Sequence, residues 1–349
     1  MLADLVEKVI GVDTHRDTHT AALISSPGGG VLAHHVAQVC VEGYEGLVEW
    51  ADESSSAADR VWAIEGTGSY GAGLSDFLQQ RGEFVIEIDR PGRPKRRMGT
   101  PKSDLDDAIA AARHGLGTQN PCVPRARGDR EALRVRLATR DQLVRQRTAA
   151  INLVKASIVT APAGLRAAIT ADKRNTIAVC AELEESSSGD SEYSNYIAIL
   201  GMTARRILGM EAEIAEHTKV IESLTQQRCP QLLAEAGVGP ITAAQIYISW
   251  SHPGRCRNEA AFANLAGTAP IQASSGQTQR HRLNRGGDRQ LNRALHIVLM
   301  SRARNDERTQ QYFIRRQHQG KSTREAKRCL KRYLARHFYR ILENPSKNT

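Results

Sequence analysis

The sequence predicts an α/β domain, then a long helical hairpin, then a mainly helical C-terminal domain. Three observations support this. Short β-forming runs come first, initially in succession and then alternating with helices, which is typical of an α/β sheet. Two long amphipathic runs follow, separated by a polar segment. The last part of the chain combines helix-forming residues with many arginines. We place the domains at residues 1–125, 126–228 and 229–349.

The α/β domain is predicted from local patterns along the first part of the chain. Apolar, β-branched runs bounded by turn-forming residues predict strands, and apolar residues at helical spacing predict helices. A basic loop rich in Pro and Gly, RPGRPKRRMGTPKS, occupies residues 90–103. The expected elements are a strand, turn and strand at 9–24, a strand at 31–39, a helix at 43–53, a strand at 61–66, a helix at 74–80, a strand at 84–90 and a helix at 104–117.

The middle of the chain predicts two long helices, over residues 129–160 and 196–227, with an acidic, Ser-rich segment between them. Such a pair can form a coiled-coil hairpin, and hairpins of this kind often mediate oligomerisation. A helical spacer packed on its own domain is an equally good interpretation. The apolar stripe of the first helix comprises Leu133, Leu137, Leu143, Ile151 and Val154.

Composition narrows the class of protein. No apolar run approaches the roughly 18 residues that a membrane helix needs, and the start of the chain lacks the pattern of a signal peptide. We therefore expect a cytoplasmic protein without a membrane partner. The 6 cysteines are scattered, without a C-x-x-C pair, so we expect a reducing compartment and no zinc site.

Positive charge is concentrated at the C-terminal end. The formal net charge is +10, and residues 276–349 hold 19 Lys and Arg against 5 Asp and Glu. Most of these cations are arginines, whose planar fork suits phosphate, so the pattern predicts a nucleic-acid partner. A solvated helical face is the alternative. Because aromatic residues make up only 5% of the chain, recognition of backbone and shape is favoured over base stacking.

Four acidic residues stand at the ends of predicted elements. Asp13 interrupts the apolar run VIGVD, Glu65 ends VWAIE, and Asp104 and Asp107 share one face of a predicted helix. Carboxylates that converge repel one another unless divalent cations lie between them, and oxygen ligands suit Mg²⁺ or Mn²⁺. Two such ions about 4 Å apart can activate an attacking oxygen and stabilise a leaving one in phosphodiester cleavage. For Asp13 alone, an acidic hairpin turn is an equally good explanation.

The motifs VIGVDTHRDTH, AIEGTGSYG and KSDLDDA together resemble the N-terminal domain of DEDD transposases of the IS110 family of insertion sequences, relatives of the Piv-type DNA invertases. The resemblance implies a RuvC-like, ribonuclease H-like fold. Asp17 and Asp106 fall outside the family pattern, and Arg16 stands where the family commonly has lysine. The family's four metal-binding, catalytic acids fall on Asp13, Glu65, Asp104 and Asp107.

The C-terminal part resembles the same family in two places. AGVGPITAAQI is similar to its helix-hairpin-helix-like element, whose glycine turn, here Gly237 and Gly239, can offer backbone N–H groups to a phosphate. From this motif alone, a helix C-cap followed by a turn is the favoured interpretation.

The block LAGTAPIQASSGQTQRHRLNRGGDRQLNRAL resembles the family's second conserved block, in which a serine before a glycine is the nucleophile. That serine falls on Ser275, with Ser274 as the alternative. A serine that attacks phosphorus forms a covalent phosphoserine–DNA intermediate. The residues alone indicate only a loop, and RGGDRQLNRAL differs from the commoner Lys-Arg-Gly-Asn form.

The resemblance also implies partners. These are the target DNA and the ends of the donor element, a structured non-coding guide RNA that pairs with both, and further copies of the chain in a dimer or tetramer. The basic loop before Asp104 and the Arg-rich end are expected to contact phosphates. The residues expected to bind nucleic acid are Arg93, Lys95, Arg96, Arg97, Lys102, Gly237, Gly239, Arg280, Arg282, Arg285, Arg289 and Arg293.

Three alternative functions make different predictions. A RuvC-like nuclease or junction resolvase would use the same acids to activate water, and it would survive Ser275→Ala. A non-catalytic nucleic-acid-binding protein would tolerate Asp13→Asn. An ATPase or kinase of the actin-like fold would need a second phosphate loop and an adenosine motif, and the sequence contains neither.

Overall fold

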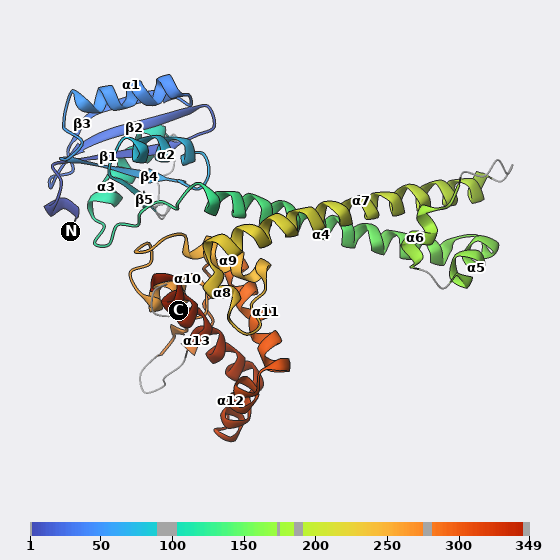
Figure 1. Cartoon of the computed structure of the whole chain (residues 1–349). Helices are drawn as coiled ribbons and strands as arrows, with labels where there is room; N and C mark the ends of the chain where they lie inside the picture. Colours follow the sequence, from blue (N-terminus) through green and yellow to red (C-terminus); the bar gives the residue numbers. More distant parts are fainter. Residues whose placement is uncertain (1, 89–102, 173–174, 185–190, 275–280, 345–349) are drawn as a thin grey trace. The chain divides into compact units, whose positions relative to one another are not determined.

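The structure is a computed structural model that describes residues 2–88, 103–172, 175–184, 191–274 and 281–344 (Figure 1). The chain divides into two compact units. The first comprises residues 1–127 and 251–257, and the second comprises residues 128–250 and 258–349. Among the described residues, no helix is long and apolar enough to cross a membrane. The division into three domains stays a prediction.

A mixed five-stranded sheet is the centre of the first unit, with the strand order β3-β2-β1-β4-β5. The first three strands form an antiparallel meander, and β4 and β5 run parallel to β1. β1 therefore has a neighbour on each side, as its continuous burial requires. The strands are β1 (Lys8–Thr14), β2 (Thr18–Ser25), β3 (Val31–Gln38), β4 (Arg60–Glu65) and β5 (Val85–Ile88).

Helices cover both faces of this sheet, and each face has its own apolar core (Figure 1). Because side chains alternate along a strand, Ile10 and Val12 of β1 point into the core that contains Leu47 of α1 and Leu74 of α2. Val9 points into the opposite core, with Ala111 and Ala112 of α3. The helices are α1 (Val41–Asp52), α2 (Ala72–Gln80) and α3 (Asp104–Leu116).

A buried ionic network joins the first residue of β4 to the loop before β5. Arg60 and Glu83 are both buried. The Arg60 Nε donates to Glu83 Oε2 at 3.0 Å, and the Trp62 indole donates to the same oxygen at 2.7 Å. Burial opposes the charge of Arg60, but its hydrogen bonds to Glu83 and Asp52 outweigh this and raise the pKa of the guanidinium. Glu83 thus neutralises a cation that water cannot reach.

Glu83→Ala is expected to lower the free energy of unfolding by about 3–5 kcal/mol, because it leaves the buried Arg60 charge without its main partner. Glu45→Ala is the matched control, since Glu45 pairs with Arg81 at 3.0 Å on the surface and such pairs contribute about 0–1 kcal/mol. Urea unfolding curves of both variants measure the difference. Equal shifts in the two variants would contradict the prediction.

The second unit contains two long antiparallel helices that lie side by side, α4 (Asp129–Thr160) and α7 (Ser191–Arg228) (Figure 1). Arg140 near the middle of α4 donates to Thr218 at 2.8 Å, and Tyr196 near the start of α7 donates to Thr160 at 3.0 Å. The first helix has its predicted bounds, whereas the second begins earlier than the predicted residue 196.

The connector between these helices has structure that its polar composition did not predict. It contains α5 (Ala163–Ala171) and α6 (Thr176–Ala181). Leu165, Ile169 and Cys180 of these helices are buried in one core with α4 and α7. Apolar residues one turn apart in these short helices pack against the pair α4 and α7. This tertiary packing stabilises helices that would be too short to form alone.

The rest of the second unit is mostly helical. Leu133 of α4, Ile221 of α7 and Ala244 of α9 share a core that joins the long helices to the C-terminal part. A short two-stranded ladder, β6 with β7, lies between α10 and α11. The elements are α8 (Pro230–Leu233), α9 (Pro240–Trp250), α10 (Glu259–Leu265), β6 (Ile271–Gln272), β7 (His281–Arg282), α11 (Arg289–Asn305), α12 (Glu307–His318) and α13 (Thr323–Glu343).

Candidate active site

Asp13 is the second-last residue of β1, and Glu65 is the last residue of the neighbouring parallel strand β4. Val12 of β1 is in register with Ile64 of β4, so the residue after each, Asp13 and Glu65, stands at the same edge of the sheet. The Thr14 hydroxyl donates to the backbone oxygen of Glu65 at 3.0 Å, which holds the two strand ends together. The carboxyl edge of parallel strands is where α/β sheets commonly place functional groups.

Helix α3 brings a further acid to this edge because it packs unusually close to β1. A Cβ on Gly11 would lie 2.2 Å from both the Ala108 backbone oxygen and the Ala112 backbone nitrogen, so only glycine permits the contact. Gly11 and Asp13 are two residues apart and therefore face the same side of the sheet. The first residue of α3, Asp104, consequently lies over the end of β1.

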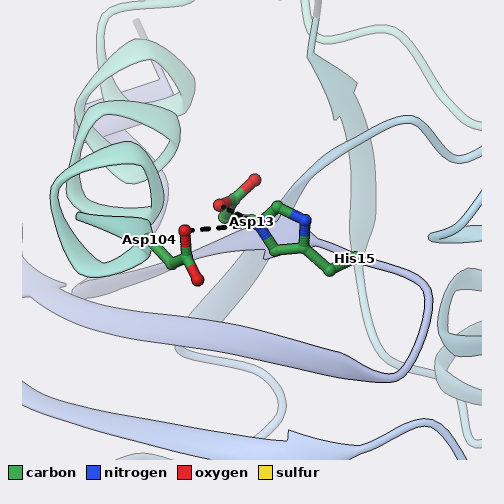
Figure 2. A group of neighbouring side chains, drawn as sticks. All are labelled: Asp13, His15 and Asp104. Carbon is green, nitrogen blue, oxygen red and sulfur yellow. Dashed lines mark hydrogen bonds and ion pairs between the residues drawn. The ribbon is translucent and has the colours of Figure 1, made fainter. Parts of the chain in front are cut away.

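Asp13 and Asp104 meet at the imidazole of His15 (Figure 2). The His15 Nε2 atom lies 3.1 Å from Asp13 Oδ2 and 3.4 Å from Asp104 Oδ1. One ligand atom from each of the three side chains lies within 4.8 Å of the other two. The sequence interpretation missed His15, although its position two residues after Asp13 was a signal that both side chains could face the same way.

The donor set of this group suits a divalent cation. Two carboxylates supply oxygen ligands for Mg²⁺ or Mn²⁺, and an imidazole nitrogen is a better ligand for Mn²⁺ than for Mg²⁺. The Asp13 side chain is 12% exposed, whereas those of His15 and Asp104 are 40% and 52% exposed. The group is thus anchored in the sheet on one side and open to solvent on the other, as a site for a large substrate must be.

The other two predicted acids, Glu65 and Asp107, are half-buried and are not part of this group. Asp107 is half-buried in the first turn of α3, and its N–H donates to the Ser103 oxygen at 3.2 Å. Three acids in this first turn also interact favourably with the positive end of the helix dipole. Asp106 and Asp17 are exposed, and Asp17 pairs with Arg16 at 3.6 Å.

Two family models match the chain, one in each half. The DEDD transposase model of IS110, described as "Transposase", matches residues 10–160. The model described as "Transposase IS116/IS110/IS902 family" matches residues 229–313. The chain belongs to the IS110 family of transposases.

This family assignment makes the chain a DNA transposase, with DNA as its partner. The first match includes Asp13, Glu65, Asp104 and Asp107, and the DEDD class suggests dependence on a divalent metal. The second match includes the block with Ser274 and Ser275. No curated protein matches the chain.

Several of the transposase's predicted site residues lie outside the described part of the chain. Ser274 is exposed and follows β6 by two residues. The residues outside the described ranges are Ser275, the predicted nucleophile, and the basic residues Arg93, Lys95, Arg96, Arg97, Lys102 and Arg280.

The predicted glycine turn of the transposase lies directly before α9. Gly237 has a positive φ of 74°, and the Gly239 N–H donates to the Thr242 hydroxyl at 3.0 Å. Thr242 thus already satisfies an N–H group that was predicted to meet a phosphate. A phosphate bound at this turn would have to displace that contact.

The four described arginines of the predicted nucleic-acid surface lie together around the start of α11. Arg282, Arg285 and Arg289 are exposed. Arg293 is engaged by Asp141 of α4 at 3.0 Å. The three exposed arginines form no ion pair with a described residue, so their charge is available to a polyanion.

Proposed function

We propose that this transposase is a site-specific recombinase that cleaves and rejoins DNA with a metal-dependent RuvC-like site and a serine nucleophile. The observation that supports this most strongly is the convergence of Asp13 and Asp104 at the edge of the sheet, within the region that the DEDD transposase model matches. The strand order 3-2-1-4-5, with the first three strands antiparallel and the last two parallel to β1, supports a ribonuclease H-like fold.

The acidic residues hold the metal in this proposal. Asp13 and Asp104 are its central ligands, Glu65 and Asp107 complete the set, and His15 adds a nitrogen donor or orients the two carboxylates. When bound, two Mg²⁺ or Mn²⁺ ions would supply the positive charge that assists attack on phosphorus and departure of the leaving oxygen. The buried position of Asp13 fixes one ligand, while the exposed Asp104 faces the substrate.

The serine supplies the nucleophile. The Ser275 oxygen forms a bond to a backbone phosphorus as one P–O bond of the DNA breaks. The serine gives up its hydroxyl proton, and the released DNA oxygen takes one up. The phosphoserine conserves the energy of the broken bond, so the strand can later be rejoined to a different end.

The partners follow from the family resemblance and from charge. We propose that a structured non-coding RNA pairs with target and donor DNA, while the basic C-terminal part binds backbone phosphates. We also propose that the chain works as a dimer or tetramer through the α4–α7 hairpin. Exposed apolar side chains on these two helices, among them Leu153, Val159, Ile199 and Met202, support this role.

Covalent trapping tests the proposal. The protein is incubated with Mg²⁺, RNA transcribed from the non-coding region beside its gene, and labelled target DNA, then denatured and examined for label attached to protein. We expect a covalent adduct that disappears in Ser275→Ala and in Asp104→Asn but remains in Ser274→Ala.

Each other result identifies a different function. Cleavage without an adduct, retained in Ser275→Ala, would identify a hydrolytic nuclease that activates water. Binding without cleavage, insensitive to Asp13→Asn, would identify a non-catalytic nucleic-acid-binding protein. Loss of the adduct in Ser274→Ala alone would move the nucleophile to Ser274.

A further inference from the structure

A pocket of about 840 Å³ lies in the second unit between the loop before α11, α11 itself and α13. Its volume falls within the roughly 300–1,000 Å³ typical of sites that enclose a small molecule. Eight Lys and Arg side chains line it, against two carboxylates, Asp288 and Glu325. We call this the basic pocket. The charge excess predicts an anionic ligand, and the volume allows more than a single phosphate group.

Both carboxylates of the basic pocket already accept hydrogen bonds within the protein. Asp288 Oδ1 accepts hydrogen bonds from the N–H groups of Gln290 and Leu291, and Asp288 Oδ2 accepts one from Ser249 at 2.6 Å. Glu325 accepts from the N–H and the hydroxyl of Ser322, in a capping box. Neither carboxylate forms an ion pair with a described arginine of the pocket, so eight cations face only two acids, both of which already accept hydrogen bonds.

The cations inside the basic pocket are crowded. Lys331 donates to Asn292 Oδ1 at 2.9 Å. Burial first, and the neighbouring Arg328 second, lower the pKa of Lys331. Burial and the nearby Lys331 likewise lower the pKa of His296. Uncompensated positive charge of this kind is relieved when an anion enters.

Both amide side chains that line the pocket already donate to protein oxygens. Asn292 Nδ2 donates to the Ala266 oxygen at 2.7 Å, and Asn284 Nδ2 donates to Asn264 Oδ1 at 2.9 Å. The described lining contains no Phe, Tyr or Trp on which a base could stack. Arg282, Arg285 and Arg289 pair with no described acid, and their planar forks suit phosphate oxygens.

The backbone at Gly287, which lines the basic pocket, is closely packed. The backbone of Gly287 lies so close to α10 that an added Cβ would be 2.4 Å from the Leu265 oxygen. Arg282 of β7 also lines the pocket and pairs with Ile271 of β6. The pocket consequently adjoins the two strands that bracket the predicted serine-bearing segment.

We infer that the basic pocket binds the backbone phosphates of a single-stranded nucleic-acid segment, next to the strand pair β6–β7. A double helix is far wider than a pocket of this volume, whereas a single strand can bend its phosphates into it. This inference rests on the proposed function only for its nucleic-acid partner. It needs neither the metal nor Ser275.

The test is fluorescence anisotropy of the full chain with a labelled oligothymidylate, in EDTA and at a series of salt concentrations. Arg285→Ala/Arg289→Ala removes two exposed arginines from one wall of the pocket. We expect at least about tenfold weaker binding and a salt slope (log K against log salt) about 1.4 smaller in magnitude, because each lost phosphate contact on a single strand removes about 0.7. Arg328→Ala, on the opposite wall, should reduce the slope by about 0.7.

The matched control is Arg166→Ala/Arg206→Ala, which removes two exposed arginines of the same unit that do not line the pocket. It should change affinity less than about twofold. An equal loss in this control, or unchanged binding in the pocket variants, would overturn the inference.

Competition by unlabelled nucleic acids identifies the class of ligand. Unlabelled oligothymidylate or oligouridylate should displace the probe more strongly than a duplex of the same length, and the stronger of the two identifies the strand as DNA or RNA. Equal competition by duplex, or displacement by millimolar inorganic phosphate, would overturn the assignment to a single strand. Because binding is measured in EDTA, where the metal-dependent covalent step cannot occur, failure of that step and failure of this pocket are distinguishable.

Discussion

Asp104→Asn is expected to slow DNA cleavage by more than about 1,000-fold, because a metal ion contributes several kcal/mol to stabilisation of the transition state. Asp104 lies 3.4 Å from the same His15 nitrogen that contacts Asp13, at the solvent-facing side of the group. Asparagine has the same shape but lacks the charge. Since the Asp104 side chain is 52% exposed, the fold should be unaffected.

Asp106→Asn is the matched control for this prediction. Asp106 is exposed in the same first turn of α3 and outside the group around His15. Both substitutions remove one charge near the helix N-terminus, which costs about 0.3–1 kcal/mol of stability in either case. Only Asp104→Asn should also weaken Mn²⁺ binding, measured by titration of the protein with the ion. Equal rates of cleavage for the two variants would mean that the acids act through general charge and not as ligands.

Gly11→Ala is expected to lower the free energy of unfolding by about 1–3 kcal/mol or more and to reduce cleavage strongly. The added methyl group would meet the backbone of α3 at Ala108 and Ala112, both at 2.2 Å. Backbone atoms cannot swing aside as a flexible side chain can, so the whole helix has to move. Asp104 would move with it, away from Asp13.

Gly46→Ala is the same kind of substitution, but here we expect the free energy of unfolding to rise slightly. Gly46 lies inside α1, and a Cβ there would meet nothing within 4 Å. Alanine in a helix interior is better than glycine by about 0.5–1 kcal/mol, so this variant should be slightly more stable and cleave normally. Urea unfolding and cleavage assays compare the two. If Gly11→Ala behaved like Gly46→Ala, the close approach of α3 would not be needed for the site.

Metal binding by Gly11→Ala separates an effect on stability from an effect on the position of α3. If α3 is displaced without unfolding, Mn²⁺ affinity should fall even at low temperature, where the chain is folded. If the site stays intact in the folded fraction, affinity is unchanged and cleavage falls only with the amount of folded protein. The proposed role of Gly11 requires the first outcome.

Local signals were enough to predict much of the fold. The helix over residues 129–160 has its predicted bounds because its helical pattern is long and continuous. The positions of Asp13 and Glu65 at strand ends were also predictable, since an apolar β run that stops at an acid marks an edge of a sheet. The helices α5 and α6 were missed, because in short segments composition outweighs a few apolar residues whose partners lie elsewhere in the chain.

His15 shows where local reasoning stops. Its sequence position allowed it to face the same way as Asp13, but nothing within a short window indicated that Asp104 would meet it. That meeting depends on how closely α3 packs on β1, and hence on the missing side chain of Gly11. The basic pocket is similar, since its two walls, the loop before α11 and helix α13, are separated along the chain.

By itself, the sequence determined which residues carry charge, where the strands of the sheet and the first long helix lie, and which acids stand at strand ends. These properties depend on periodicity and composition within a few turns or strands. Only the tertiary structure decided the strand order, the group formed by Asp13, His15 and Asp104, and the enclosure of the basic pocket. These features depend on which elements, distant in the sequence, pack against each other. Packing of this kind is decided by shape and burial across the whole unit, which a short stretch of sequence does not contain.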